Sequence, residues 1–520
     1  MRELGIFTDG TICAPATIPG TGAISIIRVS GEDSLAIADK VIDVKGESLS
    51  ETEGYRLRYG TIFADDGSVL DNVIVSVFRA PHSYTGENSV EISCHASRFI
   101  VNAVLELLVN AGARIAAPGE FTRRAFVNGK MDLAQAEAVA DVIASQSAAS
   151  HKVAMNQLKG GFSSELRVLR ERLLTMTSLL ELELDFSEED VEFASRSELG
   201  ALVEETLTHI VRLTDSFSRG NAIKNGVPVA IVGATNTGKS TLLNALLGEE
   251  RAIVSDIAGT TRDTIEETLN LGGVMFRFID TAGIRETDEV VEKIGIERTF
   301  KKLNEASIVL GMTDLSRGED SVLADAEYIW GKVNASSSDR EFVLLVNKCD
   351  VDGIESVEAG SGGGFETGSG AGYAGTGSVG GYVETGFKAG SEAGYADKAG
   401  KMAIIEAALH EKGIVIKMIP ISAKTGSGLP ELTEALAEIG RRITGDTDET
   451  LVTNIRHYEA LVRAATALGR VQEGLQVATL PPDLIAQDLR EALYHLGEIV
   501  GEISTDEVLG NIFRKFCIGK

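Results

Sequence analysis

GATNTGKS, residues 233–240, is the stretch that decides how the central part of this 520-residue chain folds. It matches the pattern G-x-x-x-x-G-K-S, follows an apolar run at 227–232 and precedes a helical pattern at 241–247. In a strand–loop–helix unit of this kind, a P-loop, backbone amides cradle a phosphate at the helix N-terminus, where the helix dipole favours negative charge. We therefore expect Lys239 to reach the β- and γ-phosphates of a nucleotide and Ser240 to bind Mg²⁺.

Three further motifs follow in the order that a guanine-nucleotide site requires. DTAG at 280–283 ends an apolar run, which places Asp280 near the metal. NKCD at 347–350 also ends an apolar run, and its Asp350 can accept hydrogen bonds from the exocyclic amine and the ring N–H of guanine, which adenine does not offer together. SAK at 422–424 completes the base pocket. The four motifs together predict binding of GTP rather than ATP.

The segment SDIAGTTRD at 255–263 lies between the P-loop and DTAG. We expect Thr261 to complete the Mg²⁺ coordination, with Thr260 as the alternative by sequence alone. Ile284 occupies the position at which Ras-like enzymes place the glutamine that orients the attacking water. Because isoleucine cannot form that hydrogen bond, another group must orient the water, and the acidic residues that follow are candidates: Glu286, Asp288, Glu289 and Glu292.

The residues expected to contact GTP come from these five motifs and from Thr241, which directly follows the P-loop. They are Asn236, Thr237, Gly238, Lys239, Ser240, Thr241, Ser255, Asp256, Ile257, Ala258, Gly259, Thr260, Thr261, Asp280, Thr281, Ala282, Gly283, Asn347, Lys348, Asp350, Ser422, Ala423 and Lys424.

Strand and helix patterns alternate around these motifs, which predicts a mostly parallel sheet with helices on both faces. The expected strands are the apolar runs at 227–232, 274–279, 307–312, 342–346 and 414–419. Glycine-rich sequence at 360–400 interrupts the alternation. Ordering so many glycines is entropically costly, so we interpret this segment as a surface excursion.

The flanking sequence has a different character. Residues 1–125 mix short apolar runs with turn signals, which indicates an α+β domain with strands at 23–29 and 73–78 and helices at 34–41 and 99–109. Helical patterns lie on both sides of the central part, at 132–158, 164–184, 198–218, 454–476 and 483–500. We infer one helical domain that is split in sequence, although two separate helical regions would give similar patterns.

Composition narrows the choice of function class. The net charge of −28 argues against broad nonspecific binding of nucleic acid but does not exclude a local basic patch. Four scattered cysteines (Cys13, Cys94, Cys349 and Cys517) are too few for a disulfide framework or a zinc site. No apolar run reaches the roughly 18 residues that span a bilayer, and residues 1–10 lack the apolar stretch of a signal peptide. We expect a cytoplasmic protein without a membrane partner.

Four further runs connect the chain to a known family: YTGE at 84–87, PGEFTRRAF at 118–126, KMDLAQAE at 130–137 and FCIGK at 516–520. With the order of the domains, they make the chain resemble the MnmE (TrmE) family of tRNA-modification GTPases everywhere except 352–400. The resemblance implies a multidomain fold: an α+β N-terminal folate-binding domain, a split all-α helical domain and an inserted α/β Ras-like P-loop GTPase domain.

The boundaries implied by the resemblance divide the chain into four parts. They are 1–127 for the N-terminal tetrahydrofolate-binding and dimerisation domain, 128–223 for the first part of the helical domain, 224–446 for the GTPase domain with its glycine-rich insertion at 352–400, and 447–520 for the second helical part, which ends in CIGK.

The family resemblance also implies an activity. Members act as homodimers that form a heterotetramer with the FAD-dependent protein MnmG. They install an aminomethyl or carboxymethylaminomethyl group at carbon 5 of the wobble uridine of certain tRNAs. The one-carbon unit comes from 5,10-methylene- or 5-formyl-tetrahydrofolate, and the amine donor is glycine or ammonium. A regulatory GTPase switch without its own modification chemistry is the alternative, and a ribosome-assembly GTPase, which would lack residues 1–125, is a third class.

Individual roles follow from the same resemblance. In the family, K⁺ replaces an arginine finger when the GTPase domains dimerise. Folate would be contacted by Arg28, Glu91, Lys130 and Lys520, and K⁺ by Asn236, Ser255, Ile257 and Thr260. Glu292 matches the family's water-orienting glutamate, and Cys517 matches its C-terminal cysteine, which is associated with the modification chemistry. The chain departs from the family at Thr235, Ser255 and the run Cys94-His95-Ala96-Ser97, and no role is assigned to Cys94 or His95.

Overall fold

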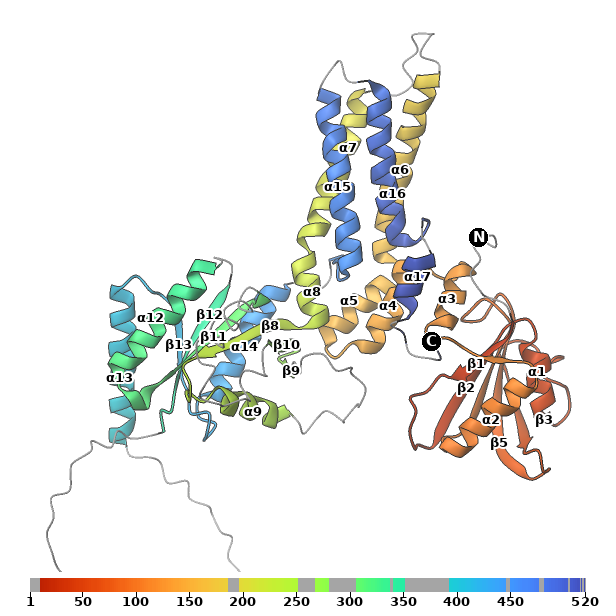
Figure 1. Cartoon of the computed structure of the whole chain (residues 1–520), viewed down its shortest axis with the longest axis horizontal. Coiled ribbons are helices and arrows are strands. Elements are labelled where there is room, and N and C mark those ends of the chain that lie inside the picture. The colour runs from red at the N-terminus through yellow and green to blue at the C-terminus, as the bar shows by residue number, and fades with distance from the viewer. Residues whose placement is uncertain are drawn as a thin grey trace, which may run out of the picture. The chain divides into compact units, whose positions relative to one another are not determined.

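The computed structural model describes residues 10–185, 196–250, 267–279, 305–336, 340–350, 392–445, 449–476, 481–503, 506–514, 516 and 519. These residues form two compact units (Figure 1). One unit comprises the described residues of Met1–Lys224 and Thr444–Lys520, and the other those of Asn225–Ile443. Each unit is described by itself.

The first unit begins with a sheet in the order β3-β4-β5-β6-β2-β1-β7, which is antiparallel except between β1 and β7. Its strands are β1 (Ile12–Pro15), β2 (Ile24–Ser30), β3 (Ile42–Val44), β4 (Arg56–Phe63), β5 (Val69–Phe78), β6 (Ser89–His95) and β7 (Arg114–Ile115). Alternate residues such as Val73, Val75 and Val77 point to one face, where α1 (Ser34–Val41) and α2 (Arg98–Asn110) bury them. The expected α+β domain is confirmed.

Helices make up the rest of this unit. They are α3 (Glu120–Val127), α4 (Leu133–Ala144), α5 (Ala148–Leu158), α6 (Gly161–Asp185), α7 (Arg196–Asp215), α8 (Phe217–Asn225), α15 (Ile455–Gln476), α16 (Pro482–Val500) and α17 (Asp506–Phe513). One apolar core contains Leu173 of α6 and Ile210 of α7 together with Leu468 of α15 and Leu489 of α16. Two distant segments of the chain therefore share a single helical core, which decides between a split domain and two separate helical regions.

The single helix expected at 132–158 was wrong, because the chain breaks between α4 and α5. Ser147 caps α5: its hydroxyl accepts from the Ser150 amide at 3.1 Å, and the Ser150 hydroxyl accepts from the Ser147 amide at 3.1 Å. Serine side chains that bond to the backbone in this way favour a helix start over a helix interior. The alanine-rich pattern on both sides hid this interruption.

A buried polar cluster joins α4 to the start of α15. Arg456 donates through Nε and Nη2 to the two carboxylate oxygens of Glu137 at 3.0 and 2.9 Å, and it also donates to the carbonyls of residues 498–499 at the end of α16. His457 Nε2 lies 2.6 Å from Glu137 Oε2, and the His457 ring stacks on Phe162. Burial by itself would raise the pKa of Glu137, but the charge and hydrogen bonds of its two partners lower it to about 2.

The second unit contains, among its described residues, a six-stranded sheet in the order β13-β12-β11-β8-β10-β9. The strands are β8 (Val227–Gly233), β9 (Glu267–Leu271), β10 (Val274–Ile279), β11 (Ile308–Asp314), β12 (Glu341–Asn347) and β13 (Lys417–Pro420). All neighbours are parallel except the β9–β10 hairpin. The prediction of a mostly parallel sheet is confirmed, with a last strand shorter than the run at 414–419.

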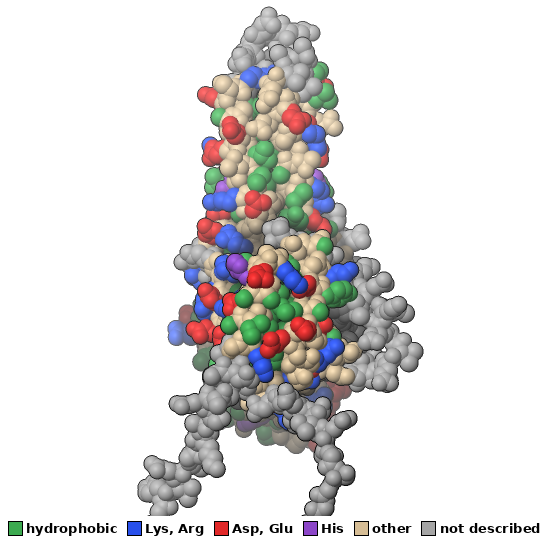
Figure 2. All heavy atoms as spheres, turned by 90° about the vertical axis from the view of Figure 1, so that its left-hand side faces the viewer, with side chains coloured by type: hydrophobic (Ala, Val, Ile, Leu, Met, Phe, Trp, Pro, Cys, Tyr) green, Lys and Arg blue, Asp and Glu red, His purple; other side chains and the backbone are tan. Residues whose placement is uncertain are grey.

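Helices cover both faces of this sheet, as expected. The helices are α9 (Lys239–Glu250), α12 (Glu319–Ser336), α13 (Glu392–Glu411) and α14 (Leu429–Thr444). Residues of α12 and α13 share a core with Ile279 on one face, whereas Gly440 of α14 lies against Phe276, which points to the other. On the face shown in Figure 2, hydrophobic side chains are mixed with charged ones. Tyr328 of α12 and Ile404 of α13 are exposed hydrophobic residues.

Only the last residues of the glycine-rich segment belong to the described part of the chain. Of the glycine-rich segment, residues 352–391 lie outside the described residues, while α13 already begins at Glu392 inside the predicted insertion. Within the part of the chain that the structure describes, no helix is both long and apolar enough to cross a bilayer.

Candidate functional site

The P-loop connects β8 to α9 at the carboxyl edge of the parallel sheet. Strand β8 ends at Gly233 and helix α9 begins at Lys239. The loop turns through left-handed backbone at Asn236 and Gly238, with φ of 62° and +99°. A Cβ atom at Gly238 would lie 2.4 Å from Asn347 Nδ2, so only glycine fits this close approach.

Lys239 is the first residue of α9, and its side chain points back into the P-loop. Its ammonium group donates to the carbonyls of Gly233 and Ala234 at 2.9 and 2.7 Å, and the Thr237 hydroxyl also donates to Ala234 O at 2.9 Å. Burial lowers the pKa of Lys239, because a charged amine loses solvation there. Both of these acceptors are neutral carbonyls, so an anionic ligand at this place would gain a charge-assisted hydrogen bond.

Asn347, at the end of β12, holds three of the predicted motifs together. Its side chain is buried, its Nδ2 donates to Thr237 O of the P-loop at 2.7 Å, and its Oδ1 accepts from the Ala423 amide at 3.0 Å. Next to Ala423, the Ser422 hydroxyl accepts from the Thr425 amide at 3.2 Å. The structure therefore brings the P-loop, NKCD and SAK motifs to one edge of the sheet.

The remaining described members of these motifs lie near this edge. Lys348 has a left-handed backbone with φ of 62°, and its ammonium group lies 2.6 Å from Asp314 Oδ2. Asp350 and Lys424 are exposed, as a residue that contacts a ligand from solvent would be. Asp314 was missed by sequence reasoning. The only signal in the sequence was an acidic residue just after the apolar run at 307–312, and its place opposite Asn347 became clear from the parallel register of β11 and β12.

Several predicted site residues lie outside the described residues, and their roles stay predictions. They are Ser255, Asp256, Ile257, Ala258, Gly259, Thr260, Thr261, Asp280, Thr281, Ala282, Gly283, Glu292, Cys517 and Lys520. Asn236, Ser240 and Thr241 are described and belong to the P-loop or to the first turn of α9.

In the other unit, Arg28 and Glu91 form a pair on adjacent strands. They are register partners of β2 and β6, and Arg28 Nε donates to Glu91 Oε1 at 2.9 Å. The guanidinium carbon lies 5.1 Å from the ring centre of Tyr84 and 5.6 Å from that of Phe121. Lys130 donates to Pro81 O at 3.0 Å, in the loop that carries Tyr84. The structure thus places Arg28 and Glu91 together and ties Lys130 to the same loop.

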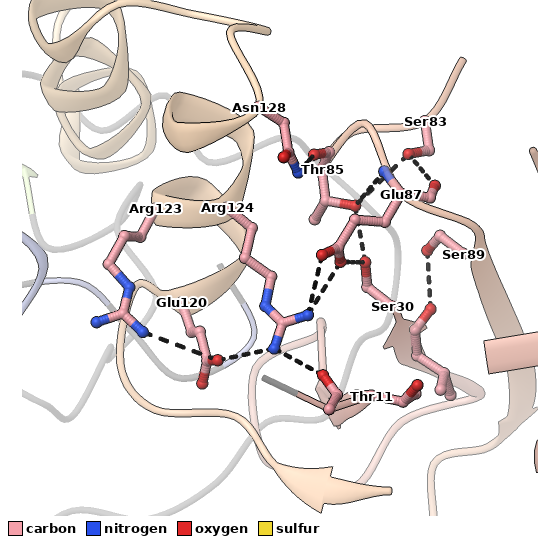
Figure 3. Close-up of polar contacts among 12 residues, drawn as sticks. Thr11, Ser30, Ser83, Thr85, Glu87, Ser89, Glu120, Arg123, Arg124 and Asn128 are labelled. Atoms are coloured by element: carbon pink, nitrogen blue, oxygen red, sulfur yellow. Dashed lines mark hydrogen bonds and ion pairs between the residues drawn. The ribbon is translucent and has the colours of Figure 1, made fainter. Parts of the chain in front are cut away.

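A buried charge network supports this loop (Figure 3). The Arg124 side chain is 1% exposed and donates to both oxygens of Glu87 at 3.1 Å, to Glu120 Oε1 at 3.1 Å and to Gly10 O at 2.9 Å. Burial by itself would raise the pKa of Glu120, but hydrogen bonds from Arg114, the Ala117 amide and Arg124 lower it. Glu87 belongs to YTGE and Arg124 to PGEFTRRAF, so two of the runs that suggested the family are in direct contact.

Two family models match the chain. The family model described as GTP-binding protein TrmE N-terminus matches residues 11–130, and the MnmE helical domain model matches residues 133–517. The chain belongs to the MnmE family of tRNA modification GTPases. The match at 11–130 covers the region that a ribosome-assembly GTPase would lack.

Whole-length relatives support the same membership. The chain is 49% identical to the tRNA modification GTPase MnmE of Parabacteroides distasonis over 513 residues, which is 98% of this chain and 100% of that protein. It is 48% identical to that of Bacteroides fragilis over 98% of this chain and 99% of the relative, and 45% identical to that of Porphyromonas gingivalis over the full length of both. As a member of the MnmE family, the chain is an enzyme that acts as a GTPase in tRNA modification.

Proposed function

We propose that the chain couples GTP hydrolysis to the modification of the wobble uridine of certain tRNAs. In this proposal it acts in the cytoplasm as a homodimer, in a heterotetramer with MnmG, and adds a (carboxymethyl)aminomethyl group at carbon 5 of the base from a tetrahydrofolate one-carbon donor. The main support is the double hydrogen bond of Asn347, which joins the P-loop to the base-binding motifs, within a chain of this family.

In the nucleotide step, each described group has a chemical task. Lys239 would replace its carbonyl partners by phosphate oxygens, and the Ser240 hydroxyl would bind Mg²⁺ together with Thr261. Asp350 would select guanine, and Glu292 would orient the attacking water. Asn236, held with positive φ in the P-loop, would bind K⁺ with Ser255, Ile257 and Thr260, and the cation would neutralise charge that develops between the β- and γ-phosphates.

The Arg28–Glu91 pair fits the donor and acceptor pattern of a folate. A carboxylate can accept the amino and ring N–H groups of a pterin, a guanidinium can donate to its oxygen or to the glutamate tail, and the rings of Tyr84 and Phe121 offer flat apolar surface. Lys130 and Lys520 would contribute further positive charge. Bound folate would supply the one-carbon unit, and Cys517 would serve the subsequent chemistry at the base.

The proposed potassium site predicts a cation-dependent rate. GTP hydrolysis by the full-length protein should be about tenfold faster or more in KCl than in NaCl at equal ionic strength, because the cation takes over part of the stabilisation that an arginine finger supplies. Release of inorganic phosphate measures this. The Asn236→Ala variant should lose most of the difference, and equal rates of the wild-type protein in the two salts would contradict the proposal.

The modification itself is tested by mass spectrometry of tRNA nucleosides. Cells that lack the protein should lack the modified wobble uridine, and the wild-type gene should restore it. Unchanged nucleosides in these cells would overturn the proposed function. In a reconstitution with MnmG, folate binding without any modified uridine would instead favour a regulatory GTPase switch.

A further inference from the structure

Asp314 uses its two carboxylate oxygens for two different tasks. Oδ1 accepts from the amide and the hydroxyl of Ser316 at 3.0 and 2.5 Å and thereby caps the short helix Leu315–Arg317. Oδ2 accepts from Lys348 Nζ at 2.6 Å. The Asp314 side chain is 5% exposed, and its position at the end of β11 places it opposite Asn347 of β12.

The charge of Asp314 favours its contact with the ammonium group of Lys348. Burial by itself would raise its pKa, but the hydrogen bonds from Lys348 and Ser316 and the charge of Lys348 lower it. The carboxylate is therefore ionised at neutral pH and forms a charge-assisted hydrogen bond with the Lys348 ammonium group. A helix cap needs only one acceptor oxygen, so capping alone does not explain a buried carboxylate whose other oxygen holds a lysine of the NKCD motif.

A lysine side chain has several rotatable bonds and loses this freedom when it packs on a ligand. If Asp314 already holds the ammonium group, the side chain of Lys348 has lost this conformational entropy before the nucleotide binds, and binding is stronger for that reason. The backbone of Lys348 is also fixed, since its φ of 62° is left-handed and its neighbour Asn347 is bonded on both sides.

We propose that Asp314 is a positioning residue of the guanine site: it holds Lys348 in the conformation that receives the base and so sets the lifetime of the bound nucleotide. This inference rests on the proposed assignment of Lys348 to the base pocket. Asp314 does not itself contact the nucleotide in this proposal, and it acts only through Lys348.

Dissociation of a fluorescent GDP analogue from the full-length protein tests the proposal. Asp314→Asn should raise the dissociation rate about tenfold, equivalent to about 1.4 kcal/mol. It should raise the KM for GTP in parallel and leave kcat within about twofold, because Asp314 touches no reacting atom. Ser316→Ala removes only a bond to the other oxygen, and Glu327→Gln removes an ion pair with Lys412 elsewhere in the unit. Both variants should release the analogue at the wild-type rate.

A double-mutant cycle separates positioning from a general structural effect. In a Lys348→Met background, Asp314→Asn should cause no further change in dissociation rate. A full tenfold effect in that background, or a wild-type rate for Asp314→Asn alone, would overturn the proposal. If Lys348→Met itself left the dissociation rate unchanged, both the assignment of Lys348 to the base pocket and the proposal for Asp314 would be contradicted. Should Asp314→Asn not fold, as judged by circular dichroism, Asp314→Glu replaces it and must show the same dependence on Lys348.

Discussion

Replacement of Lys239 by alanine is expected to weaken GTP binding about 100-fold or more and to remove measurable hydrolysis at micromolar GTP, because a buried charge that pairs with phosphate typically contributes several kcal/mol. The structure gives the reason. The ammonium group lies inside the P-loop on the carbonyls of Gly233 and Ala234, where it has lost solvation and has no other role among the described contacts.

Titration with a fluorescent GTP analogue in the presence of Mg²⁺ measures this effect. The matched control is Lys417→Ala, since Lys417 lies on β13 of the same sheet and forms, among the described residues, a long ion pair of 3.9 Å with Glu438 on the surface. That variant should bind like the wild type. If Lys239→Ala retained wild-type affinity while its circular dichroism spectrum was unchanged, the phosphate site would have to lie elsewhere.

Glu137→Gln is expected to lower the free energy of unfolding of the first unit by about 3 kcal/mol, because it leaves the largely buried Arg456 guanidinium without its carboxylate partner. Glutamine has nearly the same shape as glutamate, so the change removes charge and acceptor strength rather than volume. Denaturant unfolding followed by circular dichroism measures the loss. Glu181→Gln breaks a pair with Arg490 that also joins two helices of this unit, but its side chains are 39% and 60% exposed, so the loss should stay within about 0.5 kcal/mol.

The same variant has a predicted pH dependence. The pKa of Glu137 is lowered from 4.5 to about 2 in the folded protein, so below pH 4.5 the unfolded chain takes up a proton that the folded protein does not. The stability contributed by Glu137 is complete above this pH and is lost as the pH falls towards 2. The difference in unfolding free energy between wild type and Glu137→Gln should therefore shrink as the pH falls from 4.5 towards 2. A difference that stayed constant or grew within this range would contradict an ionised, paired Glu137.

The nucleotide site was predictable because its parts are local in sequence. The P-loop combines an apolar strand, the pattern G-x-x-x-x-G-K-S and a helix start within a few residues, and each of these features can be recognised in the sequence. Asn347 was predicted from its motif, but its bonds to Thr237 and Ala423 depend on strand order, which no local pattern encodes.

Non-local contacts account for what sequence reasoning missed. Glu137 and His457 are 320 positions apart, so nothing in either neighbourhood indicates the other. Asp314 resembles any acidic residue after a strand until the register places it beside the NKCD motif. The break before α5 was missed for a different reason. The side chains of Ser147 and Ser150 accept hydrogen bonds from backbone amides and so start a new helix, and the spacing of apolar residues does not reveal such bonds.

The shared helical core also dictates an order of events during synthesis on the ribosome. Helices α6 and α7 emerge long before α15 and α16, whose side chains complete their core, whereas residues 225–443 carry all the described strands of their own sheet. The nascent chain must therefore keep the apolar faces of α6 and α7 from aggregating while the inserted unit folds, and the helical unit closes only when translation nears its end.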